Sequence, residues 1–334
     1  MATGMLGGHT MKIHILDDWF NTLSGLPCFE KLGQHDVTVW TDHVADIDQL
    51  VDRLSDADGV VLFRERTKVT RDLVARLPNL RLISQRGVYP HIDVQACTDH
   101  GILVCSKTSG EAPAHAAAEL TFALILSAMR QLPQQMASAK AGTWQVGVGK
   151  TLHGRTLGLY GYGRIAKAVA GYAKAFGLNV IWWGSEDGRR RAIADGNTVP
   201  SSREEFFGSC DIVSVHVRML PQTKGLITAT DLASMRDGSV FVNTSRAGLI
   251  EAGALLEGLN RGRPEYAAID VFDVEPLLDP TDPLLSHPNL IATPHIGFVT
   301  EDEFDFQFSD IFDQVNAFAN GSPIHMINPE AWNV

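Results

Sequence analysis

Cysteine is scarce in this sequence, with four in 334 residues, and no two of them form a CxxC pair. The four lie far apart in the chain, at Cys28, Cys97, Cys105 and Cys210. Such a pattern argues against a disulfide framework and against a metal site built from cysteine ligands. We therefore expect reduced thiols in or near the core, and no bound metal.

Positive charge and long apolar runs are scarce as well. The chain has 28 Lys and Arg against 39 Asp and Glu, a formal net charge of −11, whereas nucleic-acid binding needs a basic face. The longest apolar stretch, Leu120 to Met129, is too short to span a bilayer. The opening residues MATGMLGGHT lack the basic and apolar regions of a signal peptide. We expect a soluble cytoplasmic protein with neither a nucleic-acid partner nor a membrane partner.

The chain does have enough residues for two domains, each with its own core. In its first third, strand-like runs alternate with segments at helical spacing. The strand-like runs are 12–16, 37–40, 59–63, 81–84 and 101–105. The helical segments are 47–54 and 70–77, followed by an Ala-rich helix over 115–130. This alternation predicts a parallel sheet covered on both faces.

A second alternating series begins after Gly154. Its strand-like runs are 157–160, 179–183, 211–217, 239–243, 266–270 and 290–293, and a last helix is expected over 303–319. No repeat or low-complexity linker separates the two series. The sequence therefore predicts an α/β protein with two doubly wound parallel-sheet domains.

The second series opens with a dinucleotide fingerprint. LGLYGYGRIA at 157–166 fits G-x-G-x-x-G/A, directly after an apolar strand and before a helical run over 166–176. Gly161 permits the tight turn, Gly163 lets the backbone approach a pyrophosphate, and Ala166 allows close helix–strand packing. Because the flanking strand and helix are both present, the motif is far more specific than an isolated GxGxxG. It predicts a bound NAD or NADP.

The acidic residue expected to bind the adenosine ribose is missing from its usual place. Gly184 stands at the end of the second strand, followed by Glu186 and Asp187 and then by three arginines at 189–191. Glu186 could bind the ribose hydroxyls of NAD, and an arginine could bind the 2′-phosphate of NADP. The arginine run could equally be the solvated start of a helix. We expect NAD, because two acidic residues stand nearer the strand end than the arginines, and NADP stays open.

Three further motifs stand at the ends of later strands, where open α/β sheets bind their ligands. They are NTSR at 243–246, IDVFDVEP at 269–276 and TPHIG at 293–297. Arg246 offers a rigid fork that matches a carboxylate. Histidine is the side chain type that titrates near neutrality, so His295 can take the hydroxyl proton of an alcohol, and Glu275 can fix its tautomer. Behind a dinucleotide fingerprint, the three together predict a catalytic set for hydride removal at an alcohol carbon.

From Lys12 to Pro329 the chain resembles the D-isomer-specific 2-hydroxyacid dehydrogenase family. It is most similar to the compact phosphoglycerate-dehydrogenase-like branch that lacks a regulatory domain. The matching stretches include KIHILDDW, LFRERT, PNLRLISQRG, TLGLYGYGRIA, FVNTSRAGLIEAGALLEGL, AAIDVFDVEP and HPNLIATPHIGFVTEDEF. The resemblance implies hydride transfer between NAD(P) and C2 of a small 2-hydroxy or 2-oxo acid. It also implies that Arg246 binds the substrate carboxylate, that Glu275 orients His295, and that His295 is the general acid/base.

The resemblance implies the domain arrangement and further site residues as well. Residues 11–108 and 299–334 would form a flavodoxin-like substrate domain and residues 109–298 a Rossmann cofactor domain, with a cleft between them. A helix beginning near His115 would contribute to a homodimer interface. Asp270 would meet the nicotinamide carboxamide. The expected cofactor-binding residues are Gly161, Gly163, Arg164, Ile165, Ser185, His216, Thr244, Ser245, Asp270 and Gly297. The expected substrate-binding residues are Arg64, Gly87, Val88 and Arg246, with backbone N–H groups of the turn at 86–89 directed to the carboxylate.

Several readings stay open. Arg64 and Arg66 could bind a second anionic group such as a phosphate, or could be surface arginines paired with Glu65. Tyr89 and Pro90 replace part of the family's usual Gly-rich turn, so the identity of the acid stays open. The physiological direction could be reduction, for instance of glyoxylate or hydroxypyruvate. A non-catalytic dinucleotide sensor or corepressor-like module on the same fold is the alternative from another class; the intact catalytic set argues against it.

Overall fold

The computed structural model describes residues 9–108 and 115–332, and the chain divides into two compact units. Unit 1 comprises Met1–Ala112 and Thr300–Val334, and unit 2 comprises Pro113–Val299. The expected boundary between residues 108 and 109 lies at the edge of segment 109–114, outside the described residues. The assignment of a substrate role to one unit and a cofactor role to the other stays a prediction.

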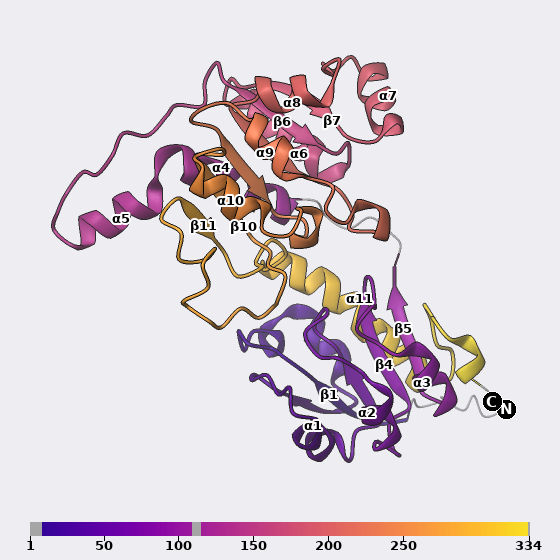
Figure 1. The fold of residues 1–334 in the computed structure, drawn as a ribbon. Coiled ribbons are helices and arrows are strands. Elements are labelled where there is room, and N and C mark those ends of the chain that lie inside the picture. The colour runs from indigo at the N-terminus through magenta and orange to yellow at the C-terminus, as the bar shows by residue number, and fades with distance from the viewer. Residues whose placement is uncertain (1–8, 109–114, 333–334) are drawn as a thin grey trace. The chain divides into compact units, whose positions relative to one another are not determined.

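Unit 1 is built on a five-stranded parallel sheet in the order β2-β1-β3-β4-β5. Strands β1, β4 and β5 of this sheet are labelled in Figure 1. Its strands are β1 (Lys12–Ile15), β2 (Asp36–Val39), β3 (Gly59–Val61), β4 (Leu82–Arg86) and β5 (Leu103–Lys107). All but β2 are largely buried, as expected for apolar strands covered on both faces. The order is the flavodoxin-like one, in which the chain reverses its direction of winding between β1 and β3.

Polar caps set the starts of the helices in unit 1. These helices are α1 (Ile47–Leu54), α2 (Arg71–Ala75), α3 (Val94–Asp99) and α11 (Glu301–Ala319), joined by short 3₁₀ segments at Leu23–Gly25, Pro27–Leu32 and Pro329–Ala331. In each α-helix an Asp or Thr precedes the first turn and accepts a hydrogen bond from a backbone N–H within it. The four capping residues are Asp46, Thr70, Asp93 and Thr300.

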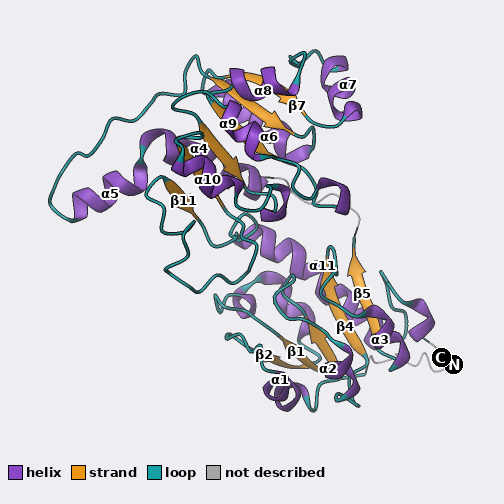
Figure 2. Ribbon diagram, viewed as in Figure 1, coloured by secondary structure: helices purple, strands orange, loops and turns teal. Residues whose placement is uncertain are grey.

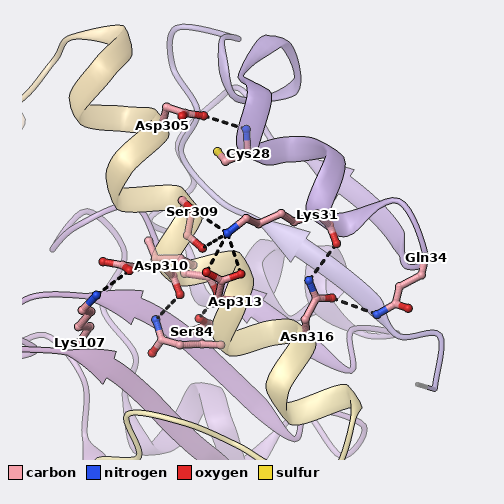
Figure 3. Close-up of polar contacts among 12 residues, drawn as sticks. Cys28, Lys31, Gln34, Ser84, Lys107, Asp305, Ser309, Asp310, Asp313 and Asn316 are labelled. Atoms are coloured by element: carbon pink, nitrogen blue, oxygen red, sulfur yellow. Dashed lines mark hydrogen bonds and ion pairs between the residues drawn. The ribbon is translucent and has the colours of Figure 1, made fainter. Parts of the chain in front are cut away.

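Helix α11 comes from the C-terminal part of the chain and is fastened to the N-terminal part of unit 1 (Figure 3). Lys31 Nζ lies 2.7 Å from Asp313 Oδ1 and 2.8 Å from Ser309 Oγ. The Cys28 N–H donates to Asp305 Oδ1 at 2.8 Å. Buried phenylalanines on the same helix complete the packing, at Phe304, Phe308 and Phe312. The sheet of unit 1 therefore depends on both ends of the chain.

Unit 2 is built on a six-stranded parallel sheet in the order β11-β10-β9-β8-β6-β7. Its strands are β6 (Thr156–Tyr160), β7 (Asn179–Trp183), β8 (Ile212–Val215), β9 (Val240–Asn243), β10 (Tyr266–Ile269) and β11 (Leu290–Ala292). Strand β6 pairs with β7 on one side and with β8 on the other. The direction of winding reverses at this point, which is where open α/β sheets bind ligands.

Helices cover both faces of this second sheet (Figure 2). They are α4 (His115–Arg130), α5 (Leu132–Lys140), α6 (Arg164–Ala175), α7 (Glu186–Ala194), α8 (Arg203–Ser209), α9 (Ala229–Ser234) and α10 (Ala254–Asn260), with 3₁₀ turns at Pro221–Thr223 and Ala247–Leu249. Helices α4 and α6 pack with Leu157 and Leu159 in one core cluster. Helices α8, α9 and α10 pack with Tyr160 in a second cluster on the opposite face. Alternate residues of β6 thus enter different cores, as the pleat requires.

The predicted α/β class with two doubly wound parallel sheets is confirmed. Every strand expected from the sequence is present, and helices α1 and α4 have the expected bounds. The short helices α3, α5 and α7 to α10 were not expected individually, because their periodicity is weak over so few residues. The four cysteines are buried and unpaired, as expected. Within residues 9–108 and 115–332 no helix is long and apolar enough to cross a membrane, and no three His, Cys, Asp or Glu residues group as metal ligands do.

Candidate active site

The fingerprint lies where β6 ends and α6 begins. Gly161 has a φ of +119°, and a Cβ there would collide with the carbonyl oxygen of His216, so only glycine fits. Gly163 precedes the first turn of α6 with a φ of −102° and no side-chain cap. Apart from its chain neighbours, no atom of the described residues lies within 4 Å of a Cβ placed on Gly163. Packing within the protein therefore does not require glycine at 163, and the open space suits a group that approaches the helix N-terminus.

His216 follows β8, next to the fingerprint. Its N–H donates to the Tyr160 carbonyl oxygen at 2.7 Å, and its ring Nε2 lies 2.9 Å from Ser214 Oγ. Burial lowers the pKa of His216 to about 4. The ring is therefore neutral at physiological pH, and places no positive charge beside the turn.

Buried Asn243 shapes the turn that presents Arg246. Its Nδ2 donates to the Arg246 carbonyl oxygen at 2.9 Å, and its Oδ1 accepts from the Ser245 N–H at 3.0 Å. Thr244 Oγ1 lies 2.7 Å from Thr121 Oγ1 of helix α4. The turn is thus held on both sides, and the Arg246 backbone leaves the strand in a defined direction.

Glu275 and His295 form a hydrogen-bonded pair. His295 Nδ1 donates to Glu275 Oε2 at 2.5 Å, and the Phe272 N–H donates to Glu275 Oε1 at 2.9 Å. Burial alone would raise the pKa of Glu275, but these two hydrogen bonds and the charges of His295 and Arg246 lower it overall. The carboxylate is ionised at neutral pH. The structure thus brings Arg246, Glu275 and His295 together in unit 2.

Asp270, which follows β10, is fully buried. Its Oδ1 accepts from Thr293 Oγ1 at 2.5 Å and from the Ile296 N–H at 2.8 Å, and its Oδ2 accepts from the Gly297 N–H at 2.8 Å. Burial raises its pKa, and these hydrogen bonds oppose the rise. Asp270 therefore holds the backbone on both sides of His295, whose own φ is +55°. Its expected contact with the nicotinamide carboxamide stays a prediction.

The remaining cofactor candidates of unit 2 lie at the ends of β6 and β7. Arg164 and Ile165 are the first residues of α6. Ser185 caps α7, and its Oγ accepts from the Gly188 N–H at 3.2 Å. The arginine run at 189–191 lies inside α7, after its first three residues and not at its start. All these residues share the carboxyl edge of one sheet with His216, Thr244, Ser245 and Gly297.

The substrate candidates of unit 1 also lie together. Arg64 follows β3, and its guanidinium nitrogen would be 3.7 Å from a Cβ placed on Gly87. Gly87 follows β4 with a φ of +95°, and Val88 beside it is 56% exposed. Arg66 instead packs against aromatic rings: its guanidinium lies 3.9 Å from the ring centre of Trp19 and 4.1 Å from that of Phe63. Arg66 packs as part of the structure of unit 1.

Residues that the sequence analysis missed hold the turn after Gly87. Gln85 Nε2 donates to the Val88 carbonyl oxygen at 3.1 Å, and Ser106 Oγ donates to the Gly87 carbonyl oxygen at 2.8 Å. The N–H groups of Val88 and Tyr89 have no acceptor in the part of the chain that the structure describes. Because the carbonyl groups of Gly87 and Val88 accept hydrogen bonds within the protein, the orientation of the turn is fixed. Its two remaining N–H groups are donors of the kind that bind an anion.

Asp310 of α11 forms ion pairs with residues next to the same turn. It is paired with Arg86 at the end of β4 and with Lys107 at the end of β5, each at 2.8 Å. Figure 3 shows the pair with Lys107. These partners are more than 200 residues away in the chain, so no local pattern could have revealed them. The positioning residues Asn243 and Thr293 left a weak signal, since each is a polar residue at the end of a buried strand.

Known proteins are similar to this chain in sequence. A family model described as D-isomer specific 2-hydroxyacid dehydrogenase, NAD binding domain, matches residues 122–297. The chain is 38% identical over 258 residues to D-3-phosphoglycerate dehydrogenase of Methanocaldococcus jannaschii, which covers 76% of this chain and 48% of that protein. It is 35% identical over 276 residues to hydroxypyruvate reductase of Thermotoga maritima, covering 80% of this chain and 87% of that protein.

A solved structure is similar over almost its whole length. It is a Ralstonia solanacearum protein provisionally named D-3-phosphoglycerate dehydrogenase oxidoreductase, with a TM-score of 0.92 and 42% identity. The match covers 97% of this chain and 99% of that one. By contrast, this chain spans about half the length of the phosphoglycerate dehydrogenases that it matches in sequence.

Proposed function

The chain belongs to the D-isomer-specific 2-hydroxyacid dehydrogenase family, and from this we propose that it is an NAD-dependent oxidoreductase of small 2-hydroxy or 2-oxo acids. A hydride would move between the nicotinamide and C2 of the acid. The two relatives named above act on different acids by name, one on phosphoglycerate and one on hydroxypyruvate. The proposal is therefore for the class of acid and not for one compound.

In this proposal Arg246 and His295 have different roles toward the substrate. The Arg246 guanidinium can hold the carboxylate through two parallel hydrogen bonds and polarise the neighbouring C2 oxygen. His295 takes the hydroxyl proton when the alcohol is oxidised and returns it when the ketone is reduced. Glu275 keeps Nδ1 protonated, which leaves Nε2 as the ring nitrogen that exchanges the proton.

The turn between β6 and α6 fits a dinucleotide. Gly163 leaves open space at the uncapped N-terminus of a 12-residue helix, and such a terminus favours a phosphate. NAD bound there would accept the hydride of the alcohol, and NADH would donate it to the ketone. The residues that we propose to hold the coenzyme are Gly161, Gly163, Arg164, Ile165, Ser185, His216, Thr244, Ser245, Asp270 and Gly297. In unit 1, we propose that Arg64 and the N–H groups after Gly87 bind an anionic group of the substrate.

The hydrogen bond of 2.5 Å between His295 and Glu275, with Arg246 close enough to act on the same carboxylate, supports this function most strongly. A dinucleotide sensor needs no such set. The test is oxidation of NADH by the purified protein across a panel of 2-oxo acids, including glyoxylate, pyruvate and hydroxypyruvate. We expect turnover with at least one acid and a large loss in His295→Ala. Tight NADH binding without turnover of any acid would contradict the proposal and favour the sensor.

We also propose that the protein forms a homodimer, to which α4, the helix beginning at His115, contributes together with α5 and the segment 141–149 after it. Helix α5 has no buried residue, and Figure 1 shows it standing clear of the sheet of unit 2. In the following segment Trp144 is 75% exposed and Val148 is 89% exposed. Apolar side chains gathered on an extended segment are typical of an interface. A second copy of the same segment would bury them, as a two-fold axis allows.

A further inference from the structure

The end of strand β7 carries a positive charge held on an aromatic ring. Trp183, the last residue of β7, is buried against Phe206. The Arg189 guanidinium carbon, from the second turn of α7, lies 4.3 Å from the centre of the Trp183 ring. Cation–π attraction at this distance favours a fixed position for the charge. Arg189 therefore keeps its guanidinium at the carboxyl end of the strand that follows the fingerprint.

The two neighbouring arginines are engaged differently. Arg190 and Arg191 are both paired with Asp187 inside the helix, at 2.5 and 2.9 Å. They neutralise the Asp187 carboxylate. Arg189 itself makes no ion pair with any carboxylate in the described ranges. Of the three arginines, it alone combines a position over the strand end with an uncompensated charge.

A carboxylate is absent from the strand end for a steric reason. Gly184 has a φ of +146°, and a Cβ there would lie 3.4 Å from the Gly161 N atom. An Asp or Glu at this position would be strained, because side chains rarely adopt that backbone conformation. The next acidic residue along the chain is Glu186, which is exposed in the first turn of α7. In sites of this kind a carboxylate at the strand end selects the ribose 2′-hydroxyl of NAD, and a nearby arginine accommodates the 2′-phosphate of NADP.

We propose that Arg189 forms a 2′-phosphate subsite, so that this protein binds NADPH as well as NADH. Arg189 supplies the charge for the 2′-phosphate. Glu186 acts in the opposite sense, since it repels the phosphate and can accept a hydrogen bond from a free 2′-hydroxyl. The inference rests on the proposed dinucleotide site and adds a second coenzyme to it.

Binding measurements on the full chain test the subsite without any turnover. Isothermal titration would compare 2′,5′-ADP with AMP, and NADPH with NADH. Arg189→Ala should weaken binding of 2′,5′-ADP and NADPH by about tenfold or more, the usual loss for a charge-assisted hydrogen bond. Binding of AMP and NADH should stay within about twofold, a change too small to reflect a lost charged contact. Arg190→Ala is the matched control and should change neither pair. Glu186→Gln should strengthen NADPH binding relative to NADH.

The outcomes separate the subsite from the function. If the unmodified protein binds 2′,5′-ADP no more tightly than AMP, or if Arg189→Ala and Arg190→Ala behave alike, the subsite does not exist, and an NADH-dependent enzyme remains. If neither NADH nor AMP binds, the dinucleotide site itself is wrong, and the proposed function fails with it.

Discussion

In unit 2, burial and a few close hydrogen-bond partners set the pKa values of individual carboxyl groups. Glu275 is the clearest example, since burial alone would raise its pKa and its hydrogen bonds from His295 and the Phe272 N–H reverse that effect. The ionised Glu275 in turn accepts the hydrogen bond of His295 Nδ1 and so fixes the orientation of the ring. The pKa of Asp270 is raised instead, because the effect of burial is larger than that of the three hydrogen bonds that it accepts. The pKa values of two buried carboxyl groups in one unit are thus shifted in opposite directions.

The role of Arg246 can be tested by a substitution that keeps its charge. Arg246→Lys should lower kcat/KM by about tenfold or more, because an ammonium group cannot hold a carboxylate bidentately. Both substrate binding and turnover should suffer, and NADH affinity should not. Steady-state kinetics and NADH titration provide the measurement. Arg261→Lys, at an exposed ion pair with Glu257 on α10, is the control and should behave as the unmodified protein does. Unaltered kinetics in Arg246→Lys would remove Arg246 from the site.

The pair of Glu275 and His295 predicts a shift in pH dependence. His295→Ala should lose about 10²–10⁴-fold in turnover with little change in cofactor affinity. Glu275→Gln should lose less, because the amide still holds the ring but does not stabilise its positive charge. Reduction needs the protonated ring, so in Glu275→Gln the rate should fall at a lower pH than in the unmodified protein. The pH–rate profile of reduction measures this shift. A midpoint that moves upward would refute the coupling even if His295 proved essential.

At the scale of elements, helix α11 links the ends of two strands to a turn of the candidate site. Asp310 pairs with Arg86 and Lys107 on neighbouring strands. Its side chain is only 18% exposed, so the pair is largely shielded from solvent. Asp313, one turn further along α11, pairs with Lys31 but is 49% exposed. The same helix thus offers a shielded ion pair and an exposed one, which makes a matched comparison possible.

The Asp310 pair predicts how stability depends on pH. Burial alone would raise the pKa of Asp310, but Lys107 and Arg86 lower it overall from its ordinary value of 3.8. Its contribution is therefore complete above that ordinary value and is lost as the pH falls through the lower folded-state value. Asp310→Asn should cost about 2 kcal/mol at pH 7, and the difference from the unmodified protein should shrink below about pH 4. Urea denaturation at several pH values gives the comparison.

The exposed pair supplies the control for this experiment. Asp313→Asn should cost less than about 1 kcal/mol, as exposed ion pairs do. Because Arg86 precedes Gly87 directly, Asp310→Asn should also raise the KM for the acid, whereas Asp313→Asn should leave it unchanged. Equal costs in the two variants, or a difference that persists at low pH, would contradict the assignment to the Asp310 pair.

At the scale of the whole molecule, the proposed dimer depends on a segment that the protomer itself does not bury. Trp144→Ser with Val148→Ser should convert the dimer to a monomer, because both side chains are exposed in one copy and would be buried only between two. Sedimentation velocity over a range of concentrations measures the oligomeric state. A control pair outside this segment, Ile193→Ser with Leu278→Ser, removes exposed apolar groups and should leave the dimer intact. A monomeric unmodified protein, or a double variant that remains dimeric, would overturn the proposal.

The sequence by itself determined the elements and the class of fold. Short apolar, β-rich runs located the eleven strands that the described residues form, and the glycines at 161 and 163 marked the junction of β6 and α6. These features are local, because a strand, a turn or a helix start depends on residues within a few positions of each other. The order of motifs along the chain also pointed to Arg246, Glu275 and His295, since the ends of parallel strands meet at one edge of a sheet.

Only the tertiary structure decided which side chains contact each other at the ends of the strands. Three consecutive arginines look alike in the sequence, yet Arg189 lies over Trp183 while the next two pair with Asp187. The expected acidic residue would be strained at position 184, because Gly184 has a φ of +146°. Asp310 reaches Arg86 across 224 positions of the chain. Such contacts depend on how whole helices and strands pack against each other. A contact between two segments that are far apart in the chain produces no periodic pattern in the sequence, so it cannot be predicted from local spacing.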